Sequence, residues 1–149
     1  MPKQKESVES RVVWGALRFL GRLVGVGKRS TPSDSACPAL DHALVKQRWT
    51  EVEVMLKKNG PENFQAAVLN ADKLLDYCLK GRGAAGDTMG ERLKSGRQLF
   101  SSHISYQAAW DGHKLRNILV HDHETEVLFH QARGAIEHFK KALDGLGVL

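Results

Sequence analysis

Three polar residues near the end of one apolar segment have side chains that can bind phosphate and move protons. Arg116, Asn117 and His121 occur in the stretch HKLRNILVHD, residues 113–122. Histidine, with an unperturbed pKa of about 6.5, exchanges protons at neutral pH. Arginine stays charged and offers a planar fork to phosphate oxygens. Asn117 precedes His121 by four residues, so on a helix its amide could hydrogen-bond the imidazole and select the tautomer.

The same stretch predicts a helix whose polar side lies opposite its apolar side, because successive residues are about 100° apart around a helix axis. The apolar side is marked by Ala108, Leu115, Ile118 and Leu119. The other side carries Trp110, His113, Asn117 and His121. A large aromatic ring and two imidazoles are unusual on a simply solvated face. We therefore expect this face to meet a second copy of the chain, with Trp110 and His113 in the interface.

Arg116 also has a purely structural interpretation. Paired with Asp72 or Asp76 of the stretch ADKLLD, it would form an ion pair inside one subunit. His121 would then lie at the C-terminus of its helix, where a positive charge interacts favourably with the helix dipole. The residues alone leave both interpretations of Arg116 open.

Two further motifs have no assigned chemistry. In HDHE, residues 121–124, two histidines that are two residues apart on a helix point about 200° apart, and no cysteine accompanies them. The glycine-rich stretch GRGAAGDTMG, residues 81–90, lacks the Gly-Lys-Ser/Thr ending of a phosphate loop and does not follow a strand. We therefore expect a turn at residues 81–90, and neither a metal nor a cofactor in the protein.

The elements that must position these residues are helices. Apolar residues recur at helical spacing in five segments, and alternating strand patterns are absent. The predicted helices cover residues 39–58, 61–80, 88–101, 105–121 and 124–143. Short loops join most of them, which favours an all-α fold, an antiparallel bundle of four to five helices over residues 39–149. Trp49 and Trp110 are expected to anchor a core or an interface in this bundle rather than to stack on bases.

A separate amphipathic helix is predicted before the bundle, over residues 1–24, followed by a flexible linker at 25–38. Its basic residues form one strip opposite an apolar half, which matches a helix lying in a membrane interface through residues 8–24. The residues expected to touch an anionic membrane are Arg11, Trp14, Arg18, Phe19 and Arg22. Docking of the same apolar half onto the domain or a partner protein is the other possibility. The arginines exclude a membrane-spanning segment.

The net charge of +5 is concentrated in this first part of the chain. Residues 1–30 hold seven basic residues against two acidic ones, whereas the remainder carries fifteen of each sign. The bundle is therefore not expected to present a broad nucleic-acid-binding face. Cys37 and Cys78 have neither the number nor the spacing of a disulfide framework. These features predict a cytoplasmic protein that is peripheral at the inner membrane face.

The run from Arg116 to His121 resembles the R-x4-H signature of the HEPN superfamily, in its form with asparagine directly after arginine. The stretches AVLNADKLLDYCLKGRGAAGDTMGERLKSGRQLF and AWDGHKLRNILVHD, with the terminal helix, are similar to small bacterial HEPN-like proteins over about residues 40–147. The resemblance implies a four- or five-helix bundle that dimerises so that two motifs meet across a symmetric interface. It also implies that Arg116 and His121 are catalytic and that Asn117 orients them, since many HEPN proteins are metal-independent ribonucleases.

Two functions are compatible with these observations. The first is a homodimeric HEPN-like bundle that acts as an interaction module or binds RNA or nucleotide, attached peripherally to a membrane. The alternative is a metal-independent endoribonuclease with a composite site at the dimer interface, in which arginine stabilises the phosphorane and histidine transfers protons. The neutral bundle favours the first function, because it has no excess charge to attract a polyanion. Asp122 and His123 also stand where toxin-type members carry a tyrosine.

Overall fold

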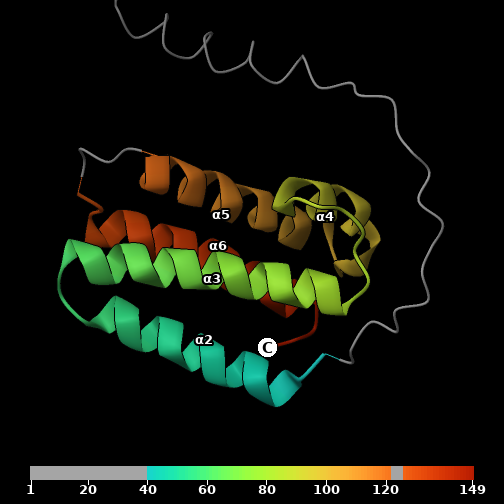
Figure 1. The fold of residues 1–149 in the computed structure, drawn as a ribbon, viewed down its shortest axis with the longest axis horizontal. Coiled ribbons are helices and arrows are strands. Elements are labelled where there is room, and N and C mark those ends of the chain that lie inside the picture. Colours follow the sequence, from blue (N-terminus) through green and yellow to red (C-terminus); the bar gives the residue numbers. More distant parts are fainter. Residues whose placement is uncertain (1–39, 122–125) are drawn as a thin grey trace, which may run out of the picture. The chain divides into compact units, whose positions relative to one another are not determined.

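The computed structural model describes residues 40–121 and 126–149, and within them every regular element is a helix. These described residues contain five α-helices and one 3-10 helix: α2 (His42–Lys57), α3 (Pro61–Gly81), α4 (Met89–Ser95), η2 (Arg97–Leu99), α5 (His103–His121) and α6 (Phe129–Gly145). The long helices α2, α3, α5 and α6 run alternately in opposite directions (Figure 1). The predicted all-α fold is therefore confirmed.

The predicted N-terminal helix and linker lie outside the described residues. The same holds for the side chains expected to touch a membrane, Arg11, Trp14, Arg18, Phe19 and Arg22. Over residues 40–121 and 126–149, no helix combines the length and the apolar character needed to cross a bilayer.

Most helix ends coincide with local sequence signals. The Asp41 side chain accepts hydrogen bonds from the backbone N–H groups of Ala43 and Leu44 at the start of α2. Pro61 occupies the first turn of α3, where its missing N–H costs nothing. Thr88 and Glu91 form a reciprocal capping box at the start of α4. These signals explain why the observed bounds of α2 and α3 lie within a few residues of the predicted ones.

The last helix begins later than its apolar pattern predicts. The prediction starts it at residue 124, but residues 126–128 are not helical and α6 begins at Phe129. Leu128 has an extended backbone, and its N–H donates to the Gln131 side chain at 3.0 Å. Val127, just before it, is buried. Val127 thus lies in the core while residues 126–128 remain outside the helix.

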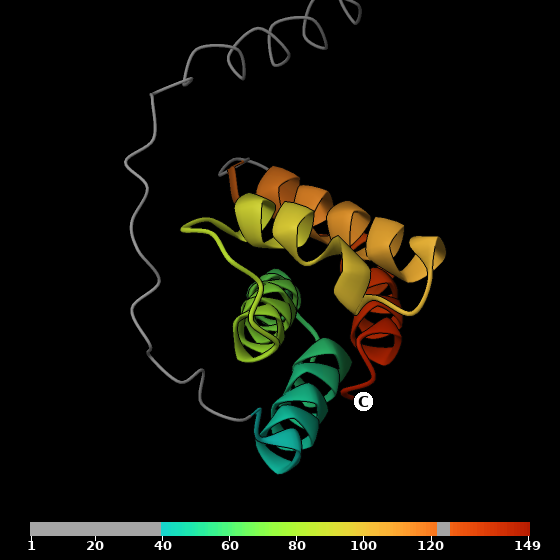
Figure 2. The same cartoon turned by 90° about the vertical axis from the view of Figure 1, so that its right-hand side faces the viewer.

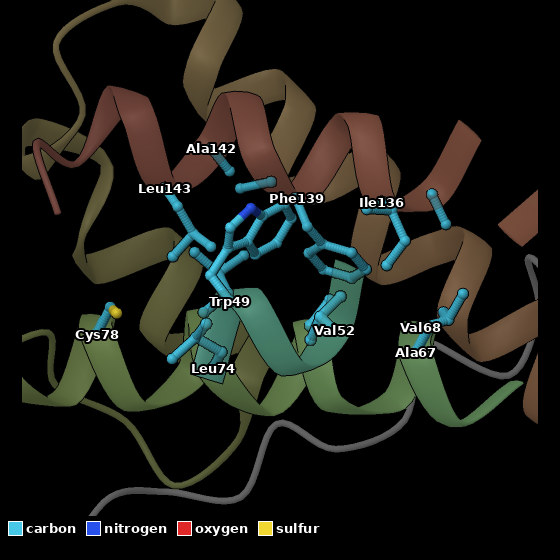
Figure 3. Close-up of a cluster of buried hydrophobic side chains, with 14 of the residues drawn as sticks. Trp49, Val52, Ala67, Val68, Leu74, Cys78, Ile136, Phe139, Ala142 and Leu143 are labelled. Carbon is cyan, nitrogen blue, oxygen red and sulfur yellow. The ribbon is translucent and has the colours of Figure 1, made fainter. Parts of the chain in front are cut away.

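The core lies where α2, α3 and α6 meet (Figure 3). Side chains from these helices point toward one another, with the Trp49 indole and the Phe139 ring near the centre of the view. The apolar residues predicted to face inward on α3 are all buried: Phe64, Ala67, Val68, Ala71, Leu74, Leu75, Cys78 and Leu79. Trp49 is buried as well, which confirms its expected role as an anchor of the core.

α5 and α6 lie side by side (Figure 2), and glycines at their contact let them approach closely. A Cβ atom built on Gly112 would lie 3.0 Å from the Phe139 ring, and one built on Gly145 would overlap the Ser105 side chain. The Ser101 N–H also donates to the Gly145 carbonyl at 2.8 Å, which joins the start of α5 to the end of α6. This contact fixes how α5 is rotated about its own axis.

Candidate functional site

The rotation of α5 differs from the one predicted. Ile118, expected in the core, has 63% of its surface exposed, whereas Leu119 is buried as expected. Trp110 packs against the core and lies edge-on to Tyr106, with ring centroids 6.5 Å apart. His113 contacts α3 of its own subunit.

The prediction that Trp110, His113 and Asn117 point away from their own bundle is therefore wrong. The physical reason is that α5 packs mainly against α6 but also against α3, where His113 and Arg116 approach Asp72. The buried face of α5 therefore includes polar residues as well as apolar ones. The polar face is thus already in contact with α3, so it does not by itself indicate an interface with a second copy.

Four side chains from α3 and α5 form a closed set of polar contacts, which we call the Asp72 cluster: Asp72, His113, Arg116 and Asn117. Asp72 Oδ1 lies 2.8 Å from His113 Nδ1, and Asp72 Oδ2 lies 3.4 Å from Arg116 Nε. Arg116 Nη1 donates to Asn117 Oδ1 at 2.9 Å. Asn117 Nδ2 lies 3.3 Å from His113 Nε2 and completes the ring.

One arrangement of hydrogens accounts for the three hydrogen bonds of the cluster. A carboxylate only accepts, so Nδ1 of His113 donates to Asp72. With the proton on Nδ1, Nε2 of the neutral imidazole accepts from the Asn117 amide nitrogen. The amide oxygen is then free to accept from Arg116. The geometry thus assigns the Nδ1-H tautomer of His113, and Asn117 orients both Arg116 and His113.

Asp72 is the most buried member of the cluster, with 7% of its surface exposed. A buried carboxylate is costly unless it is paired, and Arg116 supplies the opposite charge. The structure therefore confirms the intrasubunit ion pair of Arg116 with Asp72. Asp76, the other acidic candidate, instead binds Arg92 at 2.6 Å and Lys80 at 2.7 Å.

The guanidinium of Arg116 is not fully satisfied. Its Nε atom is buried and lies close to Asp72, but no hydrogen bond of acceptable geometry involves it. Within residues 40–121 and 126–149, Nη2 finds no hydrogen-bond acceptor either. The side chain as a whole keeps 28% of its surface exposed. The cluster thus joins α3 to α5 through polar contacts and leaves the guanidinium of Arg116 without a full set of hydrogen bonds.

His121 is the last residue of α5, and its side chain lies outside what the structure describes. The structure therefore brings together Arg116, Asn117 and His113, and says nothing about an imidazole of His121 beside them. Asn117, expected to orient His121, has its amide oxygen engaged by Arg116 and its amide nitrogen beside His113.

Other titratable groups do not extend the site. Burial raises the pKa of Cys78 to about 12, so its thiol stays protonated and is a poor nucleophile at neutral pH. The backbone N–H groups of Thr88 and Asp87 lower the pKa of Glu91, which caps α4. Across the part of the chain that the structure describes, no three histidine, cysteine or acidic side chains cluster as metal ligands would.

The contact of His113 with Asp72 was not anticipated from the sequence, although a signal for it exists. Asp72 follows Ala71 and precedes Leu74 and Leu75 on the apolar face of α3, and all three neighbours are buried. A carboxylate at such a position requires a donor from another helix. His113 and Arg116, three residues apart on α5, have the spacing to approach it from the same side.

No family model, curated protein or solved structure matches this chain.

Proposed function

We propose that this protein is a small HEPN-like helical module that acts by association, as a homodimer, and does not cleave RNA. The observation that carries the proposal is the Asp72 cluster. In it, the arginine of the R-x4-H signature has its charge balanced by a buried carboxylate of the same subunit. A guanidinium compensated in this way attracts a phosphate less strongly than a free one.

The hydrogen bonds within the cluster also support a role without RNA cleavage. Asn117 engages Arg116 and His113 through both ends of its amide, and His113 uses both ring nitrogens. Groups that satisfy one another across two helices fix the packing of these helices. A proton-transferring group, by contrast, needs a nitrogen that can reach the substrate. The cluster thus has the character of a structural clamp.

The absence of cleavage can be tested directly. Purified full-length protein is incubated with structured and unstructured RNA in the presence of EDTA, beside the variants Arg116→Lys and His121→Ala. We expect the RNA to remain intact with all three proteins, because Asp72 balances the charge of Arg116 and both ring nitrogens of His113 have partners. Gel electrophoresis of labelled RNA measures the result.

The ribonuclease is the second candidate, and one observation favours it. The fork of Arg116 is oriented by Asn117 and keeps an exposed side, as a phosphate-binding group would. Cleavage by the wild type that both variants abolish, while their circular dichroism stays unchanged, would establish this second function and refute the first.

We further propose that the module associates with anionic membranes through residues 8–24, on the basis of the arginine strip in the sequence. Replacement of Arg11, Arg18 and Arg22 by glutamate should abolish co-sedimentation with anionic vesicles, since each basic residue near such a surface contributes about 1 kcal/mol. The matched control reverses the same number of exposed charges on the bundle, Lys58, Lys94 and Lys141. Equal loss of binding in both triple variants would contradict the proposal.

A further inference from the structure

An open groove of about 560 Å³ runs between α2 and α6. These two helices make few direct contacts, because α2 packs mainly on α3, whereas α6 packs on α5 and α3. The groove has an apolar lining made by Trp49, Leu56, Phe129 and Ile136. Trp49 and Ile136 are almost completely buried and belong to the core, so the groove reaches down to the core of the bundle.

Two exposed apolar residues lie where α6 begins, and the second of them also lines the groove. Leu128 and Phe129, at the start of α6, have 51% and 47% of their surfaces exposed. Phe129 rests on Phe64, with ring centroids 5.5 Å apart, and also lines the groove. A hollow and an apolar projection thus lie side by side on one face. A face of this kind can be complementary to itself, as a two-fold symmetric interface requires.

The charges around the groove are also self-complementary. The rim holds two acidic and three basic residues: Glu53, Glu137, Lys57, Arg133 and Lys140. Arg133 pairs with Glu137 at 2.9 Å and Lys140 with Asp144 at 3.3 Å, in exposed contacts within α6. Exposed pairs of this kind contribute little, so they can exchange partners with a second copy. A rim of both signs fits such a copy better than it fits a polyanion.

Two exposed isoleucines on α5 do not form a surface comparable to the groove. Ile104 and Ile118 lie on the outer side of α5, each with 63% of its surface exposed. They are four helical turns apart, and Gln107, Asp111 and Lys114 lie between them on the same side. Single exposed apolar residues are normal on a protein surface, whereas a contiguous apolar patch beside a groove marks an interaction site.

We infer that two copies of this chain associate through the groove between α2 and α6, with Leu128 and Phe129 of each copy seated in the groove of the other. This inference rests on the proposed self-association and names the surface that carries it. The interface buries the exposed part of Phe129, and aromatic side chains seated in a pocket contribute most of the binding energy of such contacts.

The test compares full-length wild type with Phe129→Glu, Leu128→Glu and the control Ile118→Glu, which adds the same charge to a more exposed site on α5. Light scattering and sedimentation across micromolar concentrations measure the dissociation constant, and circular dichroism confirms that each variant is folded. We expect the two groove variants to raise the dissociation constant at least about tenfold, because a buried carboxylate without a partner opposes association. Ile118→Glu should associate like the wild type.

The outcomes separate the two proposals. A wild type that is monomeric at every concentration overturns both the groove inference and the proposed self-association. A dimer that survives both groove variants, or that Ile118→Glu weakens equally, overturns the groove inference and leaves the self-association standing.

Discussion

Replacement of Asp72 by alanine should lower the free energy of unfolding by about 2–3 kcal/mol. The change removes the acceptor of His113 Nδ1 and leaves the buried Nε of Arg116 without its ion-pair partner. The expected loss lies below that for a fully buried ion pair, because Arg116 keeps 28% of its side chain exposed and water screens part of its charge. Urea denaturation followed by circular dichroism measures the difference.

A matched control is Asp111→Ala, which removes a carboxylate from a partly exposed position of α5. Asp111 contacts Lys114 at 3.7 Å and Gln107 at 3.0 Å, and its removal should change the free energy of unfolding by less than about 0.5 kcal/mol. If Asp72→Ala were equally mild, the Asp72 cluster would not clamp α3 to α5. The double variant Asp72→Ala/Arg116→Ala should lose less than the sum of the single changes, because neither charge remains without its partner.

Gly145→Ala should lower the free energy of unfolding by about 2–3 kcal/mol, because the added Cβ would overlap the Ser105 side chain where α5 crosses α6. A Cβ is fixed by the backbone, so no change of rotamer on α6 relieves the overlap, and the two helices must separate. Separation would also strain the hydrogen bond from the Ser101 N–H to the Gly145 carbonyl. Thermal or urea unfolding measures the loss.

Gly134 provides the control within the same helix, since a Cβ built there meets no atom within 4 Å. Gly134→Ala should stabilise the protein by about 0.5–1 kcal/mol, because alanine loses less backbone entropy than glycine on forming a helix. Gly145→Ala should be less damaging when Ser105 is replaced by glycine. The same loss in both backgrounds would show that the contact with Ser105 is not its cause.

Local sequence signals were sufficient to place α2, α3 and the start of α4. The caps at Asp41 and Thr88 and the proline at position 61 involve residues only a few positions apart, so the sequence displays them directly. The start of α6 was missed because the burial of Val127, which favours the extended conformation there, depends on contacts with distant parts of the chain. The candidate site was found in part, since Arg116 and Asp72 were recognised as possible partners and His113 was assigned to the opposite face.

The sequence by itself determined that residues 40–121 and 126–149 form an all-helical bundle, because the spacing of apolar residues is a property of each helix and requires no partner. It also determined the core faces of α2 and α3. Only the tertiary structure decided which side of α5 is buried. The spacing of apolar residues predicts an apolar contact such as that with α6, but it cannot predict a polar contact with α3. The attraction of His113 and Arg116 to the buried carboxylate of Asp72 joins residues more than forty positions apart. The meaning of the Arg116 motif therefore depended on a carboxylate that only folding brings beside it.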